Sequence, residues 1–124
     1  MLIKPNQHFH TININSDGFR GPELLSDDLQ KYRIFVVGGS TIFGAGATSD
    51  QTTIPAFLQS KFNTLDVGTK IEVINAGIVS ANSITEKYLI ENILVTYKPS
   101  LIIIYDGWND SEDRITNEIG RAHV

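Results

Sequence analysis

The chain has 124 residues, which is enough for one domain and too few for two large ones. Hydrophobic residues make up 41% and charged residues 19%, a balance typical of a globular chain rather than a disordered one. The net charge of -4, without a Lys/Arg cluster, argues against a nucleic-acid binder. The lack of cysteine excludes disulfides and thiolate metal sites. No apolar run is long enough to span a bilayer.

The first thirty residues are predicted to form an irregular lead-in. Apolar side chains in residues 9–14 favour a short strand, and Asn, Ser, Asp and Gly at residues 15–18 are typical of a turn. Residues 24–30 are predicted to form a short helix.

From Arg33 onward, strands and helices are predicted to alternate. Residues 34–37 are a continuous apolar run ended by two glycines, which is typical of a strand buried on both faces. Apolar side chains recur at helical spacing in residues 54–62, with Pro55 acceptable in the first turn. Residues 71–75 form the next predicted strand, which is closed by Ala76 and Gly77.

The third pair of elements follows the same rhythm. Ser83 to Glu86 has the form of a capping box, which predicts that a helix begins at this point. Its apolar face extends to Tyr97, and Pro99 is predicted to end it. Residues 101–105 are predicted to be a third buried strand.

This alternation predicts an α/β fold with three layers: a parallel, flavodoxin-like sheet covered by helices on both faces. We expect the strand that leads to Ser40 to lie between the other two. Ligands bind such sheets beyond the carboxyl ends of the strands. The three predicted ends carry Ser40, Gly77 and the segment with Asn109.

These residue types suit acyl transfer. A serine hydroxyl is a weak nucleophile until a base removes its proton, and the reaction also needs donors for the oxyanion. Backbone amides near Ser40 and Gly77 and the side-chain amide of Asn109 are the candidate donors. Each feature alone also has an ordinary structural explanation as a turn, so the prediction depends on their occurring together in order.

The three segments resemble conserved blocks of the SGNH/GDSL hydrolases. Gly38-Gly39-Ser40-Thr41, with Gly44 downstream, resembles the nucleophile block in a Gly-Gly-Ser variant of Gly-Asp-Ser; Asn75-Ala76-Gly77 resembles the second block, and Gly107-Trp108-Asn109-Asp110 the third. The resemblance implies the SGNH hydrolase fold and an esterase or lipase activity with Ser40 as nucleophile. It also implies Gly77 and Asn109 as oxyanion donors, and no metal or organic cofactor.

Residues 15–21 also resemble a segment that precedes the nucleophile block in such proteins. No chemical role is predicted for Arg20 within it.

One part of the family pattern is missing. The resemblance implies an Asp-x-x-His that supplies the base, and the chain contains none; His8 and His10 are predicted to lie on the surface of the lead-in, and no aspartate stands three positions before His123. We therefore expect residues 31–118 to be the N-terminal part of the domain, incomplete at the C-terminus, inactive alone and poorly stable. Residues 119–124 resemble a translated sequencing adapter and are interpreted as a non-native read-through tail.

Other functions remain open at this point. The same acyl-serine chemistry would serve an O-acyltransferase, and some SGNH-like domains are inactive binding modules. A nucleotide-binding module is less favoured, because the glycines after the first strand fit neither Gly-x-Gly-x-x-Gly nor a P-loop. The expected partner is a small-molecule or carbohydrate ester and not a nucleic acid; neither the substrate nor the compartment is fixed.

Overall fold

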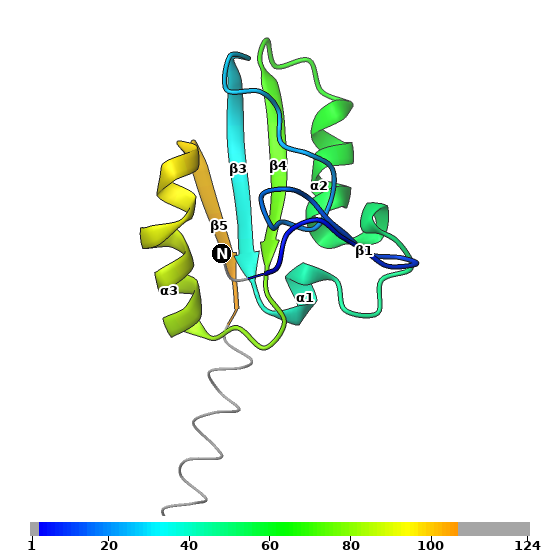
Figure 1. Ribbon diagram of the computed structural model, residues 1–124. Coiled ribbons are helices and arrows are strands. Elements are labelled where there is room, and N and C mark those ends of the chain that lie inside the picture. Colours follow the sequence, from blue (N-terminus) through cyan, green and yellow to red (C-terminus); the bar gives the residue numbers. More distant parts are fainter. Residues whose placement is uncertain (1–2, 107–124) are drawn as a thin grey trace, which may run out of the picture.

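The computed structural model describes residues 3–106 and has a three-stranded parallel sheet at its centre (Figure 1). The strands are β3 (Lys31–Gly38), β4 (Lys70–Gly77) and β5 (Leu101–Tyr105), and their order in the sheet is β4-β3-β5. The predicted α/β class is confirmed. The strand that leads to Ser40 lies in the middle, as expected.

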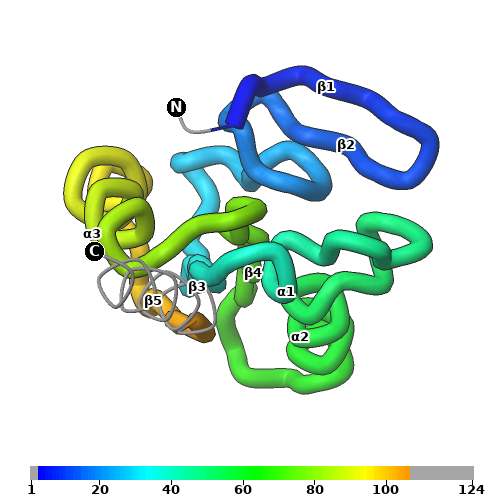
Figure 2. Tube along the Cα trace, turned by 90° about the horizontal axis from the view of Figure 1, so that it is seen from below, coloured from blue at the N-terminus to red at the C-terminus, as the bar shows by residue number. Residues whose placement is uncertain are grey.

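Helices cover both faces of this sheet (Figure 2). The helical elements are α1 (Ser40–Phe43), the 3₁₀ helix η1 (Asp50–Thr52), α2 (Ile54–Asn63), α3 (Ser83–Asn92) and the 3₁₀ helix η2 (Leu94–Tyr97). On one face, buried side chains of β3 and β4 pack against α3 and η2: Phe35, Val37, Ile74, Ala76, Leu89 and Leu94. On the other face, side chains of β3 pack against α1 and α2: Ile34, Val36, Ile42, Leu58 and Phe62. Burial on both faces explains the continuous apolar run in β3.

The lead-in is more ordered than predicted. A hairpin of β1 (Gln7–His8) and β2 (Asn13–Ile14) replaces the single strand expected at residues 9–14, and Phe9 is 62% exposed. The turn predicted at residues 15–18 is confirmed, with Gly18 at φ 89°.

The helix predicted at residues 24–30 is wrong. The Leu25 N–H donates to Glu72 Oε2 (2.6 Å), and the Leu25 carbonyl accepts from Arg33 Nη2 (2.9 Å). A helix over residues 24–30 would need the Leu25 carbonyl for its own hydrogen bonds, whereas an N–H in its first turn has no partner within the helix, so the contact with Arg33 takes the group that the helix would require.

The predicted start and length of α3 are also corrected. Asn82 is the N-cap instead of Ser83, and its Oδ1 accepts from the Thr85 N–H at 3.1 Å. The predicted helix to Tyr97 is broken at Ile93, whose φ of -121° lies outside the helical range, and η2 completes the segment. The predicted apolar face still packs on the core, because the short 3₁₀ helix keeps it turned toward the sheet.

Two predicted burials are wrong. On α2, Ile54 is 48% exposed and Phe57 is 58% exposed, while the rest of the predicted apolar face is packed inward. The strand β5 is not buried: Ile104 is 54% exposed and Tyr105 is 63% exposed. Within residues 3–106, β5 pairs only with β3, so its outer side lacks a neighbouring strand.

The outer edge of β4 is capped by a side chain. Gln59 of α2 accepts from the Val73 N–H at 2.7 Å and donates to the Ile71 carbonyl at 2.9 Å. Arg20 of the lead-in forms an isolated antiparallel bridge with Asn75 further along the same edge. These contacts satisfy backbone groups that an open edge strand would otherwise leave unpaired.

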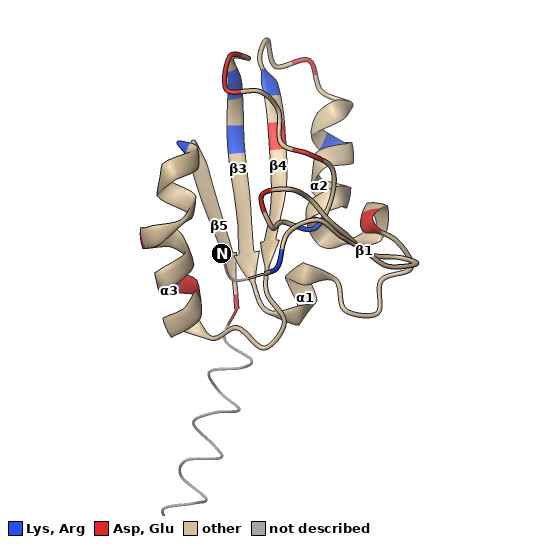
Figure 3. Ribbon diagram, viewed as in Figure 1, with Lys and Arg blue, Asp and Glu red and all other residues tan. Residues whose placement is uncertain are grey.

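Charged residues on the two long strands gather at their amino ends (Figure 3). Arg33 and Glu72 are both buried and form an ion pair, with Nε 2.7 Å from Oε1. Beyond this pair, β3 and β4 carry no Lys, Arg, Asp or Glu up to their carboxyl ends. The carboxyl edge of the sheet is therefore the uncharged end of both strands.

Candidate functional site

The carboxyl ends of the three strands lie level at one edge of the sheet. Gly38, at the end of β3, pairs with Gly77 on one side and with Tyr105 on the other. Ser40 follows Gly38 by two residues, so the structure brings Ser40 and Gly77 to the same edge. Asn109 lies outside the described residues, and β5, the strand before it, ends at this edge. This is the edge where open α/β sheets bind ligands.

Ser40 is the first residue of α1, which begins directly after β3 (Figure 1). Gly39 is the N-cap, and the Ser40 carbonyl accepts from the N–H groups of Gly44 (2.8 Å) and Ala45 (3.0 Å). Ser40 is half-buried. Within residues 3–106, no hydrogen bond engages its hydroxyl.

Two glycines allow α1 to lie directly against the strand ends. A Cβ atom on Gly77 would come within 2.2 Å of the Phe43 nitrogen. A Cβ on Gly38 would come within 2.4 Å of the Tyr105 oxygen and 2.5 Å of Ile42 Cγ1. Glycine is therefore required at both positions for space.

The backbone amide of Gly77, a predicted oxyanion donor, already has a hydrogen-bond acceptor. It donates to Asn75 Oδ1 at 2.9 Å, and Asn75 Nδ2 donates to the Phe43 carbonyl at 3.2 Å. Asn75 is 5% exposed. Its two hydrogen bonds link the end of β4 to the end of α1. To bind an oxyanion, the Gly77 amide would have to break its hydrogen bond to Asn75 Oδ1. The close packing of α1 against Gly77 requires no such change.

Arg20 is a buried cation beside α1, and sequence reasoning gave it no role. Its Nη1 donates to the carbonyls of Phe43 (3.0 Å) and Gly44 (2.8 Å), and its Nη2 donates to the Thr11 carbonyl (2.8 Å). Its Nε pairs with Asp50 Oδ1 at 2.8 Å. A single arginine in a polar lead-in gives no sign of burial in the sequence; the resemblance of residues 15–21 to a family segment was the only signal.

Asp50 is the anion that balances Arg20. Besides Arg20, it accepts from the Asn13 N–H (3.2 Å) and from Asn13 Nδ2 (2.7 Å). Burial acts to raise the pKa of Asp50, but the hydrogen bonds from Arg20 and Asn13 outweigh it, so the pKa lies below its ordinary value. Asp50 therefore stays ionised near neutral pH and keeps Arg20 paired.

The loop before Arg20 is shaped by the side chain of Asn15. Its Oδ1 accepts from the N–H groups of Asp17 and Phe19, both at 3.0 Å, and its Nδ2 donates to the Pro22 carbonyl at 2.9 Å. Phe19 is buried in the core on the α3 side of the sheet. Residues 15–21 therefore form a structured loop that delivers Arg20 to α1.

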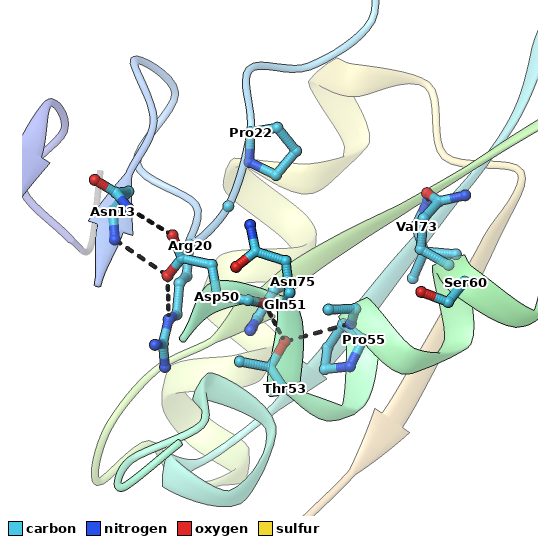
Figure 4. A pocket seen from close by; sticks show the side chains of 13 residues that line it. Asn13, Arg20, Pro22, Asp50, Gln51, Thr53, Pro55, Ser60, Val73 and Asn75 are labelled. Carbon is cyan, nitrogen blue, oxygen red and sulfur yellow. Dashed lines mark hydrogen bonds and ion pairs between the residues drawn. The ribbon is translucent and has the colours of Figure 1, made fainter. Parts of the chain in front are cut away.

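A cavity of about 460 Å³ lies along the edge of β4, between the lead-in and α2 (Figure 4). Ser40 is not among its lining residues. Its polar walls include Arg20, Asp50, Gln59 and Asn75, whose side chains already bond to one another or to the backbone. The cavity therefore supplies no part of the Ser40 site.

Among residues 3–106, no group of three or more His, Asp or Glu side chains is placed to hold a metal ion. In the same part of the chain, no helix combines the length and the hydrophobicity that a membrane crossing requires.

A scan against protein-family models gives no match to the chain, and a search of curated protein sequences gives none either. The fold and the site define a mixed α/β protein. Its parallel sheet carries a serine just beyond the carboxyl end of its middle strand.

Proposed function

We propose that this chain belongs to a serine hydrolase of the SGNH type, which cleaves a small-molecule or carbohydrate ester through an acyl-Ser40 intermediate. The observation that carries the proposal is the position of Ser40: the first residue of α1, directly beyond the middle strand and level with the ends of β4 and β5. The order of the three sequence blocks supports the same assignment.

The proposed reaction has two steps. In the first step, the Ser40 hydroxyl attacks the ester carbonyl, a histidine accepts its proton, and the alkoxide leaves with that proton as the alcohol. Water then attacks the acyl-serine through the same base, and the free acid is released. The sequence contains no Asp-x-x-His, so the proposal assigns the base to a histidine outside these 124 residues.

The tetrahedral oxyanion needs hydrogen-bond donors. The Ser40 N–H and the Asn109 side-chain amide are the main donors in this proposal. Gly77 joins them only if its amide leaves Asn75 Oδ1, which it now contacts at 2.9 Å. Removing one such donor typically slows acyl transfer by about 10²–10³-fold.

The test uses the complete product of the gene that contains this sequence. With a chromogenic acetate ester, Ser40→Ala should lower kcat by about 10⁴-fold or more. Asn109→Ala should lower it by about 10²–10³-fold. Ser60→Ala is the matched control and should keep wild-type turnover, because this exposed serine of α2 borders the cavity beside β4, whose lining does not include Ser40.

A fluorophosphonate should form a covalent adduct on Ser40 in the wild type and none in Ser40→Ala. Unchanged turnover in Ser40→Ala, or an adduct on another residue, would refute the assignment. Formation of the free acid without an added acceptor identifies a hydrolase. Transfer of the acyl group only to an added sugar, which becomes its ester, would identify a transferase.

A further inference from the structure

The carboxyl end of α1 is held by a buried guanidinium group. Arg20 Nη1 donates to the carbonyls of Phe43 and Gly44, the last residue and the C-cap of the helix. Carbonyls at the end of a helix have no partner within it, so Arg20 satisfies two of them. A helix of four residues is not stable on its own, and contacts from outside therefore determine whether α1 forms.

The rest of the guanidinium group is fixed from other sides. Asp50 binds Nε, the Thr11 carbonyl binds Nη2, and the centroid of the Phe43 ring lies 5.3 Å from the guanidinium carbon. Gly44 makes room for this arrangement, because a Cβ there would lie 2.9 Å from Arg20 Nη1. Only a planar group with several donors meets all these partners at once, and the ammonium of lysine does not.

We propose that Arg20 is a positioning residue: it holds α1 against the sheet and thereby fixes the Ser40 hydroxyl at the strand ends. The Ser40 carbonyl accepts from the N–H of Gly44, whose own carbonyl Arg20 binds, so loss of Arg20 loosens the turn that Ser40 begins. The effect on Ser40 chemistry rests on the proposed function, whereas the effect on α1 does not.

Arg33 offers a matched control in the same chain. It is equally buried, it pairs through Nε with the carboxylate of Glu72 (2.7 Å), and it donates to the carbonyls of Leu25 (2.9 Å) and Tyr97 (3.0 Å). It stands five residues before Gly38 in β3, roughly 16 Å from the strand end at the usual rise per residue. Arg33→Lys should therefore cost comparable contacts without touching α1.

The first test is amide hydrogen exchange, followed by NMR, in the complete gene product and its variants. In Arg20→Lys, exchange at Gly44 and Ala45 should accelerate about 10- to 100-fold more than exchange at Val37 in the core, because the local contacts of α1 are lost. In Arg33→Lys the three amides should change by one common factor. If Arg20→Lys also changes all three by one factor, the proposal is overturned.

Asp50→Asn is the second variant, in case Arg20→Lys fails to fold. It keeps the guanidinium group and its bonds to Phe43 and Gly44 but weakens the bonds of residue 50 to Arg20 and Asn13, so the same pattern is expected at Gly44 and Ala45 with a smaller amplitude. A uniform change at Gly44, Ala45 and Val37 in this variant would equally overturn the proposal.

The second test measures the reaction of Ser40 with a fluorophosphonate in the complete gene product. Arg20→Lys should lower the maximal labelling rate by about 10-fold or more without weakening the initial binding of the reagent, and Arg33→Lys should leave the rate unchanged. If the wild type does not react, the proposed function fails while the exchange result stands on its own. If the wild type and Arg20→Lys react equally fast, the positioning role fails and the proposed function survives.

Discussion

Gly38 and Gly77 pair with each other across β3 and β4, and α1 packs directly against both. Glycines after a strand suggest a sharp turn and a close approach of substrate to the backbone. The structure gives a different reason for them: the backbone of α1 occupies the space that a side chain on Gly77 would need, and the Tyr105 oxygen and the Ile42 side chain occupy that space at Gly38. At the scale of single residues, these positions are therefore part of how Ser40 is seated.

Gly77→Ala should displace α1 from the end of β4. The new methyl group would meet the Phe43 nitrogen at 2.2 Å, and overpacking of this kind costs about 1–3 kcal/mol of unfolding free energy. Urea unfolding measures the loss, and NMR shifts at Ser40 report the displacement.

Gly68→Ala is the control for this variant. A Cβ at Gly68 meets nothing within 4 Å, but its φ of 76° should cost about 1–2 kcal/mol as backbone strain. Only the Gly77 variant should shift the Ser40 signals. Unchanged Ser40 signals in Gly77→Ala would show that α1 does not rest on this glycine.

The meeting of Ser40 and Gly77 could be predicted, because successive parallel strands place their carboxyl ends at one edge of a sheet. The partners of α1 could not. Arg20, Asp50 and Asn75 are polar residues far apart in the sequence, and neither hydrophobic periodicity nor spacing indicates that they lie close together in the fold. The acceptor for the Gly77 amide was missed for the same reason.

The elements β3, α2 and β4 were predictable because each buries a regular pattern of apolar side chains. The failures occur where a tertiary contact replaces a local preference. Arg33 binds the Leu25 carbonyl, which the helix expected there would need for its own hydrogen bonds. At α3, Asn82 competes with Ser83 for the capping role, and both residue types suit it, so the sequence alone leaves the choice open.

At the scale of elements, Gln59→Leu should weaken the attachment of α2 to β4. The variant removes an acceptor from the Val73 N–H and a donor from the Ile71 carbonyl, at a cost of about 1–2 kcal/mol. Exchange of the Val73 amide should accelerate. Gln51→Leu, on the exposed surface of η1, should change neither quantity. Wild-type exchange at Val73 in Gln59→Leu would mean that the edge of β4 is protected by something else.

Two arginine–carboxylate pairs join the lead-in to the rest of the molecule: Arg33 with Glu72, both buried, and buried Arg20 with the partly buried Asp50. Arg33 and Glu72 bind the backbone of Leu25 near the amino ends of the strands. Arg20 and Asp50 bind the hairpin and α1 near the carboxyl ends. These contacts tie the lead-in to the sheet, so the ionisation of Asp50, whose pKa lies below its ordinary value, is coupled to the stability of the whole unit.

Acid should test this coupling through Asp50. Its pKa in the folded protein lies below the ordinary value of 3.8, so the ionised form favours folding. That contribution is complete above about pH 5 and is lost as the pH falls through the folded pKa. Asp50→Asn lacks it at every pH. The difference in urea midpoint between wild type and Asp50→Asn should thus be largest near neutral pH and shrink below about pH 4.

Asp66→Asn, on the exposed loop after α2, is the control and should unfold at nearly the wild-type midpoint at each pH, since an exposed carboxylate contributes little to stability. A constant difference between wild type and Asp50→Asn across the whole range would show that Asp50 acts through hydrogen bonds that survive its protonation. In that case Asp50 would hold Arg20 by geometry alone, and the charge of the carboxylate would not couple the lead-in to the sheet.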